Sequence, residues 1–575
     1  MTPQEFLDEF GTLAESAEGV PKLRQLILEL AVRGKLVEQN EDDEPASDLY
    51  QRMLNEASGS NGSGKRQPKA SPDVTDEDAP FPIPSSWCWL RFGQFLDIQG
   101  GGQPPKSKFV YAPEDGYIRL LQIRDFGPKP EPVFVPRDTV TRLCTSDDVM
   151  LARYGASVGK VFLGQDGAYN VALTRILFSH EHLAQRFIHL LLRSPIFQVH
   201  LEDSSRSAQA GFNKGNIHPI PLPVAPLAEQ HRIVSKVDEL MGLCDRLEAV
   251  QGERRGVRAR LNRSSLDRLT SVSGVGARQR GSELSAAWQR VCDHFEVLYD
   301  TPETLPDLRQ TILQLAVQGK LVPQDPNDEP AEELLTHIEL ARIDYEQNGS
   351  ARKRKPVPEL TTDDIAFDAP SAWSWIQFEK IAELAGGVAK GRKLGGKKTV
   401  TFPYLRVANV QMGFLNLDVM KDIDIPLDEL TKYRLERDDL LLTEGGDWDK
   451  LGRTAIWEGQ IETCLHQNHV FRGRLYVPER IRPRWVRLVM NSGVGRDYFA
   501  RASKQTTNLA SINMTQLRSC PIPIPPAVEQ ERILAKVRSV LDHIDQLDET
   551  LNRRETTRTK ALIAASHSIL NGGAS

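Results

Sequence analysis

Two loops of this chain approach the spacing of a phosphate-binding loop, in which backbone amides and one lysine hold the phosphates of a nucleotide. Gly391–Lys398 reads GRKLGGKK, so Lys398 stands where the motif GxxxxGK[ST] requires a hydroxyl that binds magnesium. Gly155–Lys160 reads GASVGK, which is one residue short and is followed by Val161. Neither loop predicts nucleotide hydrolysis, and we interpret both as flexible basic turns.

Metal and methyl-transfer chemistry are not indicated either. Cys464, His466 and His469 (CLHQNH) are residue types that bind zinc, but their spacing fits no common zinc finger and no second ligand pair stands nearby. Asn170 and Asn468 lie in polar and aromatic strings, yet the tetrapeptide Asn/Asp-Pro-Pro-aromatic of adenine-N6 methyltransferases does not occur. The GxGxxG and HExxH motifs are absent as well. We therefore expect no catalytic centre, no metal site and no cofactor in this chain.

Basic residues gather after glycine-rich turns at two equivalent places. Lys106 and Lys108 follow Gly100–Gly102, and a denser group follows Gly386-Gly387. That denser group consists of Lys390, Arg392, Lys393, Lys397 and Lys398. The whole chain has a net charge of −6, so its bulk charge gives no argument for nucleic acid. Two matching basic loops nevertheless favour contacts with phosphate groups.

The two basic loops match because the chain contains the same order of segments twice. The repeated strings are Leu23–Val37 (LRQLILELAVRGKLV) and Leu308–Val322 (LRQTILQLAVQGKLV), Asp42–Ala46 and Asn327–Ala331, Trp87–Trp89 and Trp373–Trp375, and Pro226–Val237 and Pro526–Val537. The period is about half the chain, far above the ~20–50 residues of a solenoid repeat. The sequence therefore predicts a duplicated pair of domains.

Each half is predicted to contain a helical hairpin, a polar linker, a compact domain and a long helix, in that order. Pro21 and Pro306 lie just before the first apolar-periodic stretch, and Gly34 and Gly319 follow it, which are start and stop signals of a helix. The expected segments are 1–56 (N-terminal helical region), 57–83 (flexible linker), 84–225 (first compact domain), 226–272 (first long helix), 273–304 (connector), 305–346 (second helical region), 347–369 (linker), 370–525 (second compact domain) and 526–570 (second long helix).

The local patterns predict the fold class of these segments. Short β-type runs between glycine-rich turns, such as Ile118–Arg124 and Leu440–Thr443, predict α+β domains with a mostly β, twisted-sheet core. After each domain, apolar positions recur at steps of four and three, the a/d seam of a coiled coil. These positions are Ile233, Val237, Leu240, Cys244, Leu247 and Gln251 in the first copy, and Ile533, Val537, Val540, Ile544, Leu547 and Leu551 in the second. We expect the two long helices to pair with each other.

Composition predicts a soluble globular protein with several folded units, since 40% of the 575 residues are hydrophobic and 26% are charged. The six cysteines form no CxxC pair, which is typical of a reducing compartment. No basic and apolar leader is visible, and no apolar run approaches the ~18 residues of a membrane span. We therefore expect the chain in the cytoplasm.

Together these features resemble the specificity subunit of type I restriction–modification enzymes, in the larger subgroup with an extended N-terminal helical region. The likeness is carried by the paired LRQxILxLAVxGKLV helices, the Trp-x-Trp starts of the compact domains and the paired PxxEQxRI helix starts. Arg153–Lys160 (RYGASVGK) and Thr443–Arg453 (TEGGDWDKLGR) also resemble this family. The likeness covers nearly the whole chain and occurs in both halves.

The resemblance implies a non-catalytic role in a larger complex. Each compact domain would be a target recognition domain that reads one half of a split, asymmetric DNA sequence. The two long helices would pack antiparallel as a coiled-coil spacer between the domains. Two modification subunits would dock on the helical parts and supply S-adenosylmethionine chemistry at adenine N6. Restriction subunits would add translocation and cleavage that depend on ATP and magnesium.

The same resemblance gives candidates for base contacts, because amide and guanidinium groups pair bidentately with adenine and guanine edges. Gln122 and Arg124 follow the first glycine-rich loop, and Asn409 and Gln411 are predicted at the matching point of the second domain. Further candidates are Arg153, Tyr154, Ser157, Lys160, Tyr169 and Asn170 in the first domain, and Glu444, Asp447, Trp448, Lys450, Arg453, Gln467, Asn468 and His469 in the second. Acidic members could accept a hydrogen bond from cytosine N4, or they could hold a neighbouring arginine in place.

Two other classes of function stay open from the sequence. The chain could be a nuclease or methyltransferase in its own right, which an activity assay with S-adenosylmethionine or magnesium would reveal. It could also be a stand-alone DNA-binding protein or a scaffold whose coiled coil joins two adaptor domains. Salt-dependent DNA binding would separate a DNA reader from a scaffold that does not touch DNA.

Overall fold

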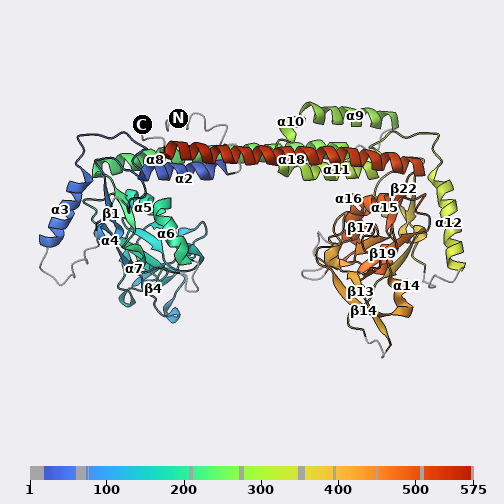
Figure 1. Cartoon of the computed structure of the whole chain (residues 1–575), viewed down its shortest axis with the longest axis horizontal. Helices are drawn as coiled ribbons and strands as arrows, with labels where there is room; N and C mark the ends of the chain where they lie inside the picture. The colour runs from blue at the N-terminus through green and yellow to red at the C-terminus, as the bar shows by residue number, and fades with distance from the viewer. Residues whose placement is uncertain are drawn as a thin grey trace. The chain divides into compact units, whose positions relative to one another are not determined.

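The computed structural model describes residues 18–59, 73–75, 77–205, 211–270, 277–347, 356–392, 397–446, 451–505 and 510–571. The chain forms two compact units, one of Met1–Arg254 with Arg554–Ser575 and the other of Arg255–Arg553 (Figure 1). Helices α8 (Leu227–Thr270) and α18 (Ala527–Asn571) each contribute to both units. Each unit therefore contains the first part of one long helix and the last part of the other.

The helical hairpins contain α2 (Gly19–Val32) and α3 (Ala46–Gly59) in the first unit, and α11 (Leu305–Val317) and α12 (Ala331–Gln347) in the second. Gly34 and Gly319 end α2 and α11 with φ of 67° and 68°, in the left-handed region that favours glycine. A Cβ at Gly34 would lie 2.5 Å from the Pro84 ring, and one at Gly319 would lie 2.6 Å from the Pro370 ring. Glycine is therefore required at each position for two reasons, the positive φ angle and the close approach of the compact domain.

The first compact domain is closed by antiparallel pairing of β1 (Cys88–Arg91) with β10 (Pro221–Val224). Its main sheet has the order β2-β9-β6-β7, formed by Asp97–Gly100, Leu173–Leu177, Val149–Ala152 and Val161–Leu163. Its second sheet has the order β4-β3-β8-β5, formed by Phe134–Pro136, Tyr117–Leu121, Gly167–Tyr169 and Leu143–Cys144. Only β3 and β8 pair in parallel among these described strands.

The second compact domain repeats this topology with a different sequence. Strands β11 (Ser374–Gln377) and β22 (Pro521–Ile524) close it. The main sheet β12-β19-β15-β17 consists of Ala382–Gly386, Val470–Leu475, Leu440–Thr443 and Thr454–Ile456. The second sheet β14-β13-β18 consists of Lys421–Pro426, Thr399–Leu405 and Leu465–His466, again with one parallel pair. A small sheet β16-β21-β20 is formed by Gly445–Gly446, Ala510–Ser511 and Lys504–Gln505.

Short helices accompany these sheets in each unit (Figure 1). They are α4 (Phe92–Phe95), α5 (Gln185–Arg193), α6 (Pro195–Ser205) and α7 (Lys214–Ile217) in the first domain, and α13 (Phe378–Ile381), α14 (Leu430–Tyr433), α15 (Pro483–Asn491), α16 (Gly493–Ala502) and α17 (Met514–Arg518) in the second. Helices α9 (Ala277–Asp293) and α10 (Phe295–Leu298) do not belong to these domains and lie between α8 and α11 in the sequence. The expected α+β class with two repeated halves is confirmed.

The repeated Pro-x-x-Glu-Gln-x-Arg string fastens the first compact domain to its hairpin and its long helix. The buried Glu229 carboxylate accepts hydrogen bonds from Trp87 Nε1 at 2.9 Å and from Gln39 Nε2 at 2.6 Å. Gln230 Oε1 accepts from the Ala184 amide, just before α5, at 2.9 Å. Arg232 donates to the Asp43 carboxylate at 3.2 Å.

The second unit contains the same network at the repeated residues. Glu529 accepts from Trp373 Nε1 at 2.9 Å and from Gln324 Nε2 at 2.6 Å, and Gln530 Oε1 accepts from the Arg482 amide at 2.9 Å. Arg532 donates to Asp328 at 3.0 Å. Burial raises the pKa of both glutamates above the usual range, although their hydrogen bonds oppose the shift. The strings that repeat in the sequence are thus the ones that join each compact domain, whose sequence differs between the halves, to the hairpin and the long helix.

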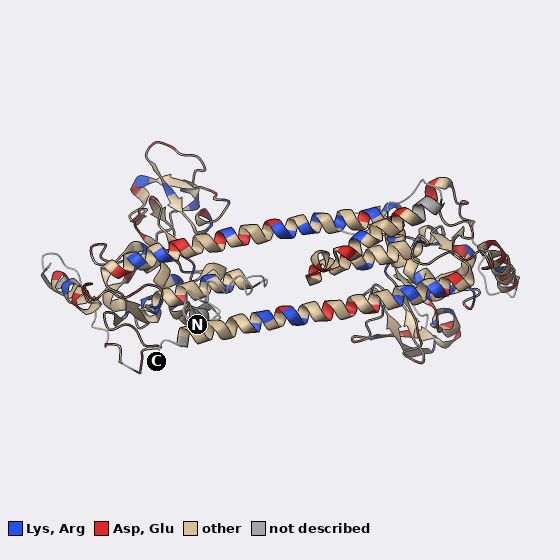
Figure 2. Ribbon diagram, turned by 90° about the horizontal axis from the view of Figure 1, so that it is seen from above, with Lys and Arg blue, Asp and Glu red and all other residues tan. Residues whose placement is uncertain are grey.

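Three helices, and not a pair alone, bury the predicted a/d seam. In the first unit, Leu240 and Cys244 of α8 share a core with α2 and with Leu562 and Ile569 of α18. In the second unit, α11 and Ile544 of α18 share a core with the end of α8. Arg24 of α2 also forms an ion pair with Asp245 of α8 at 2.7 Å. Figure 2 shows that charges of both signs alternate along the two long helices.

The lysine of each repeated GKLV string binds the end of a long helix. Lys35 Nζ donates to the Leu570 carbonyl at the end of α18, at 2.7 Å. Lys320 Nζ donates to the Thr270 carbonyl at the end of α8, at 2.9 Å. The last carbonyls of a helix lack partners within the helix and carry partial negative charge, so an ammonium group stabilises them. Each repeat therefore caps the long helix of the other. No described helix combines the length and apolar character that a bilayer-spanning segment needs.

Candidate nucleic-acid interface

Four segments that follow strand ends meet at one edge of the first compact domain. The glycine-rich turn after β2 contacts the turn after β8, since the Gly102 amide donates to the Tyr169 carbonyl at 3.0 Å. The Asn170 amide donates to the carbonyl of Leu121, the last residue of β3, at 3.1 Å. The loop after β6 joins them through the Arg153 amide, which donates to the Ala172 carbonyl at 2.8 Å. The sheet thus brings together side chains that are far apart in the sequence.

The second domain builds the same edge with equivalent hydrogen bonds. The Val388 amide donates to the His466 carbonyl at 2.8 Å, and the Gln467 amide donates to the Leu405 carbonyl at 2.8 Å. The Glu444 amide donates to the His469 carbonyl at 3.0 Å. A Cβ at Gly101 or at Gly387 would collide with a carbonyl of the turn that it contacts. This close approach explains why a glycine-rich turn occurs at the same point of both domains.

The loop Arg153–Lys160 presents polar and aromatic groups at the first edge. Arg153 Nε donates to the Phe212 carbonyl at 2.8 Å, and its guanidinium lies 5.0 Å from the centre of the Tyr154 ring. Tyr154 is 43% exposed, and Lys160 is exposed as well. Ser157 lies half-buried in the short helix η4 (Gly155–Ser157). The Arg153 and Tyr154 pair offers both hydrogen-bond donors and a flat ring to a ligand at this edge.

Ser157 also stands at the centre of a GxSxG string, the spacing of a hydrolase nucleophile elbow. An elbow requires a strand followed by a helix that positions the serine beside a histidine. Here the string joins β6 to its antiparallel neighbour β7. Within the described residues, no histidine forms a hydrogen bond with Ser157. The string therefore gives no support for a hydrolase centre.

Gln122 lies at the step from β3 to the short helix η2 (Ile123–Phe126). Its Nε2 is buried and has no hydrogen-bond partner among the described residues. Arg124 is exposed and forms an ion pair with Glu131 at 2.8 Å. Lys106 and Lys108 are exposed on a short helical turn and form no ion pair within the part of the chain that the structure describes.

The interpretation of Asn409 as a base-reading residue is wrong. Asn409 is only 3% exposed, and its side chain hydrogen-bonds to the backbone. Its Oδ1 accepts from the Arg406 amide at 3.0 Å, and its Nδ2 donates to the Asn416 carbonyl at 2.9 Å. Asn409 occupies the place of Asp125, whose carboxylate accepts from the Gln122 amide at 2.7 Å. The residue that matches Gln122 is therefore Arg406.

Tyr169 is a core residue and not part of an accessible surface, so its assignment to DNA binding is also wrong. The ring is 1% exposed and its hydroxyl bonds to the Gln99 carbonyl at 3.2 Å. Burial raises the pKa of Tyr169 to about 12. Its neighbour Asn170 is half-buried, and Asn170 Oδ1 accepts from the Ala172 amide at 3.1 Å, which shapes the turn.

The candidates of the second edge are held in two polar pairs. Arg453 Nη1 donates to Gln411 Oε1 at 2.8 Å. Glu444 pairs with His469 at 2.7 Å, and His469 Nε2 lies 3.2 Å from Asn468 Nδ2. Gln467 is half-buried at the same turn. Glu444 in this domain stands where Arg153 stands in the first, so the two edges differ in charge at one backbone position.

The basic loop of the second domain is partly neutralised by acidic residues. Arg392 forms an ion pair with Glu429 at 2.5 Å, and Lys397 pairs with Asp428 at 3.1 Å. Lys390 and Lys398 are exposed. The remaining predicted residues, Lys393, Asp447, Trp448 and Lys450, lie outside the described residues.

Comparison with known proteins agrees with this geometry. Residues 85–253 match the family described as type I restriction modification DNA specificity domain. The EcoEI specificity subunit of Escherichia coli is 28% identical over 591 residues, which cover 96% of this chain and 94% of that protein. The EcoAI specificity subunit of the same organism is 28% identical over 582 residues, with the same coverage of both chains.

Residues 85–253 thus carry the DNA specificity domain of type I restriction–modification systems, and the chain is similar to type I specificity subunits over nearly its whole length. The relatives are specificity subunits by name, which agrees with the prediction of a recognition subunit. A crystal structure described as the HsdS subunit from Thermoanaerobacter tengcongensis is 17% identical, with a TM-score of 0.40, and it covers 86% of this chain and 98% of that one.

Sequence reasoning missed two residues at the second edge of this specificity subunit. Arg406 stands in the place of Gln122, and the signal that could have found it is the Asp or Asn three positions later that caps the turn in both domains. Phe414 is 60% exposed in the turn after Gln411, whose amide bonds to the Phe414 carbonyl at 3.0 Å. An exposed aromatic ring in a single loop leaves no periodic signal in the sequence.

His466 belongs to the core of the second recognition domain and makes this domain sensitive to acid. Burial lowers the pKa of His466 to about 4, and its Nδ1 donates to the Val470 carbonyl at 2.7 Å. An unfolded histidine takes up a proton near pH 6.5, so between pH 6.5 and 4 the unfolded state binds a proton that the folded state does not. Stability should therefore fall with pH in this window, by about 2 kcal/mol between pH 7 and pH 5.

Urea unfolding at pH 7 and pH 5 tests this prediction. The variant His466→Asn cannot titrate, so its loss of stability on acidification should be smaller than that of the wild type by about 2 kcal/mol. An equal acid dependence in both proteins would contradict a neutral, buried His466.

Proposed function

We propose that this chain reads a split, asymmetric DNA sequence in the cytoplasm, one half-site for each recognition domain, within a type I restriction–modification complex. The observation that carries the proposal is that both domains have the same order of strands in the main sheet and the same edge, yet different side chains at equivalent positions of that edge. Gln122 corresponds to Arg406, Arg153 to Glu444, and Lys160 to Arg453. A common frame with different contents is suited to two unlike half-sites.

The chemistry of these side chains fits base edges and phosphates. Guanidinium groups of Arg153 and Arg406 are donors for guanine, the Gln122 amide suits adenine, and the Glu444 carboxylate can accept from cytosine N4. Exposed lysines such as Lys106 and Lys390 are suited to phosphates, which position the protein without reading sequence. Both kinds of contact are needed for a specific complex.

The long helices are proposed to set the distance between the half-sites. Helix α8 has 44 residues and α18 has 45, which corresponds to roughly 66 Å at 1.5 Å per residue. Two helices of nearly equal length, each capped by a lysine of the other repeat, support an antiparallel coiled-coil spacer.

Modification subunits are proposed to dock on the helical parts and to supply S-adenosylmethionine chemistry, while restriction subunits would supply ATP- and magnesium-dependent steps. Apolar side chains of α8 are exposed in each unit, among them Leu243 at 47% and Leu261 at 52%. The two leucines are about five helical turns apart and so lie on the same face of α8, and an apolar stripe on one face is a surface that a partner protein can cover.

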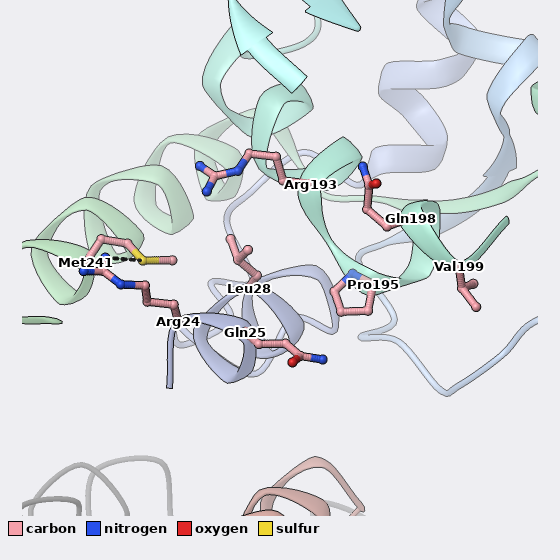
Figure 3. A pocket seen from close by; sticks show the side chains of 8 residues that line it. All are labelled: Arg24, Gln25, Leu28, Arg193, Pro195, Gln198, Val199 and Met241. Atoms are coloured by element: carbon pink, nitrogen blue, oxygen red, sulfur yellow. Dashed lines mark hydrogen bonds between the residues drawn. The ribbon is translucent and has the colours of Figure 1, made fainter. Parts of the chain in front are cut away.

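A hollow of about 480 Å³ in the first unit supports the same docking (Figure 3). Arg24 of α2, Arg193 at the end of α5 and Met241 of α8 line it, with Gln198 of α6. Burial lowers the pKa of Arg193 and the nearby Arg24 lowers it further, while the charge of Arg24 is itself paired with Asp245. An acidic side chain of a partner protein is the group that would fit this hollow.

Substitution in one domain tests the proposed function. With a modification subunit present, Arg406→Ala should relax the second half-site only, at ~1–3 kcal/mol for a lost bidentate contact. Lys106→Gln with Lys108→Gln should weaken binding to all sequences and reduce the dependence of affinity on salt. The measurements are sequencing of methylated sites and DNA binding at several salt concentrations.

Lys536→Gln on α18 is the matched control, because it removes an exposed lysine outside both recognition domains. If Arg406→Ala left the methylated sequence unchanged in both half-sites, Arg406 would not be a base-reading residue. Binding that does not depend on salt would favour a scaffold that does not touch DNA, and methylation by the pure chain would favour an enzyme.

A further inference from the structure

We infer that the first unit contains a site for a divalent transition metal that fastens helix α3 to the first recognition domain. Its ligands are Glu56 of α3 and Glu181 and His182, which lie between β9 and α5. One ligand atom from each of these residues lies within 4.8 Å of the other two. The His182 ring is buried, at 4% exposure, and its Nε2 is 2.8 Å from Glu56 Oε2.

The second unit offers an internal comparison, because the same backbone position is occupied there by a permanent cation. The Ala184 amide donates to Gln230 in the first unit, and the Arg482 amide donates to Gln530 in the second. Ala184 and Arg482 are therefore equivalent, and the residues two positions before them, His182 and Arg480, are equivalent as well. The turn hydrogen bonds agree, since the amides of His182 and Arg480 each donate to the carbonyl three residues earlier.

Arg480 joins the second hairpin to its recognition domain through charge. Its guanidinium lies 3.6 Å from the Glu329 carboxylate and 3.3 Å from Nδ1 of His337, a residue of α12. A positive group between hairpin and domain is therefore part of the frame in the second unit.

The first unit has His182 in place of this arginine, and the carboxylate of Glu56 on α3 lies beside it. Within the described residues, neither Glu56 nor Glu181 forms an ion pair with a lysine or arginine. Two carboxylates at this separation repel each other unless a positive charge compensates them. A divalent ion between them would supply that charge and join α3 to the domain, as Arg480 joins the second hairpin.

The ligand types indicate which metal fits. Imidazole nitrogen with carboxylate oxygens is a ligand set of zinc and of neighbouring divalent transition metals, whereas magnesium and calcium prefer oxygen ligands alone. Glu56 and Glu181 are exposed, so an ion can enter from solvent and water can complete its coordination. The site would be structural, because it lies in the hairpin contact and not at the recognition edge.

The test is titration of the full-length chain, without DNA or partner subunits, with Zn²⁺ by calorimetry and with Co²⁺ by visible absorption. All proteins carry Cys292→Ser, which removes an exposed thiol that could bind metal. We expect the parent protein to bind one equivalent at this site, and Glu181→Gln and His182→Ala to weaken it at least about tenfold. Glu479→Gln, the equivalent of Glu181 in the second unit, is the matched control and should bind as the parent does.

Hydrogen exchange of residues 46–59 gives a second measurement that does not depend on how the variants fold. Zn²⁺ should slow exchange of α3 in the parent protein and in Glu479→Gln, and EDTA should reverse the effect. Equal metal binding by the parent and Glu181→Gln, or exchange of α3 that does not respond to Zn²⁺, would overturn the inference.

Discussion

Inserting one heptad after Leu247 and one after Leu547 is expected to abolish methylation of the original DNA target. One heptad keeps the a/d register of each long helix and lengthens it by ~10 Å, which equals about three base pairs of rise. The DNA groove also turns by about a tenth of a turn for each base pair, so the original spacing can no longer be read. Any new target should contain the same half-sites with a longer unread gap between them.

Sequencing of methylated sites in cells that express the variant with its modification subunit measures this result. A heptad in one helix alone is the control, because it shifts one side of the pair and should cost stability before it changes the target. An active double insertion with an unchanged gap would show that the long helices do not set the distance.

Trp87→Ala is expected to lower the free energy of unfolding of the first unit by about 3–5 kcal/mol and to abolish its contribution to recognition. The indole packs against Phe187 and donates to the buried Glu229, which would be left without one of its donors. Glu229 also accepts a hydrogen bond from Gln39 of the hairpin. Loss of the tryptophan should therefore weaken the contacts of the domain with both the hairpin and the long helix. Urea unfolding combined with hydrogen exchange locates the loss in the first unit.

Two further variants separate packing from hydrogen bonding in this network. Trp87→Phe keeps most of the packing and should cost about 1–3 kcal/mol for the lost donor to Glu229. Trp373→Ala removes the repeated tryptophan and should destabilise the second unit instead. If Trp87→Ala left both DNA recognition by the first domain and hydrogen exchange of the first unit unchanged, the hydrogen-bond network around Glu229 would not stabilise this unit.

The duplication, the helices and the frame could be predicted from the sequence because their signals are either local patterns or closely similar repeated strings. The periodic apolar residues of α8 and α18 and the glycines after α2 and α11 indicate helices without knowledge of any partner. The repeated Glu229 and Glu529 mark important positions, although the sequence does not tell that each one binds a tryptophan more than a hundred residues away.

The polar residues of the recognition edge were only partly predictable, since the same residue types serve the backbone and a ligand. An asparagine in a loop suits an adenine edge, yet Asn409 is buried and caps the turn that begins at Arg406. The family resemblance makes Tyr169 a candidate for DNA contact, but its strand lies between β3 and β5 and its ring is buried.

The sequence by itself determined that this protein has two equivalent halves, each with a compact domain between a hairpin and a long helix, because closely similar strings in the same order favour similar local structures. Only the tertiary structure decided which side chains of the two domains correspond and which of them reach solvent. That correspondence depends on strand pairing across long separations, as in the contact of Asn170 with Leu121 and of Gln467 with Leu405. Hydrogen bonds of this kind join distant segments and leave no periodic trace in the sequence.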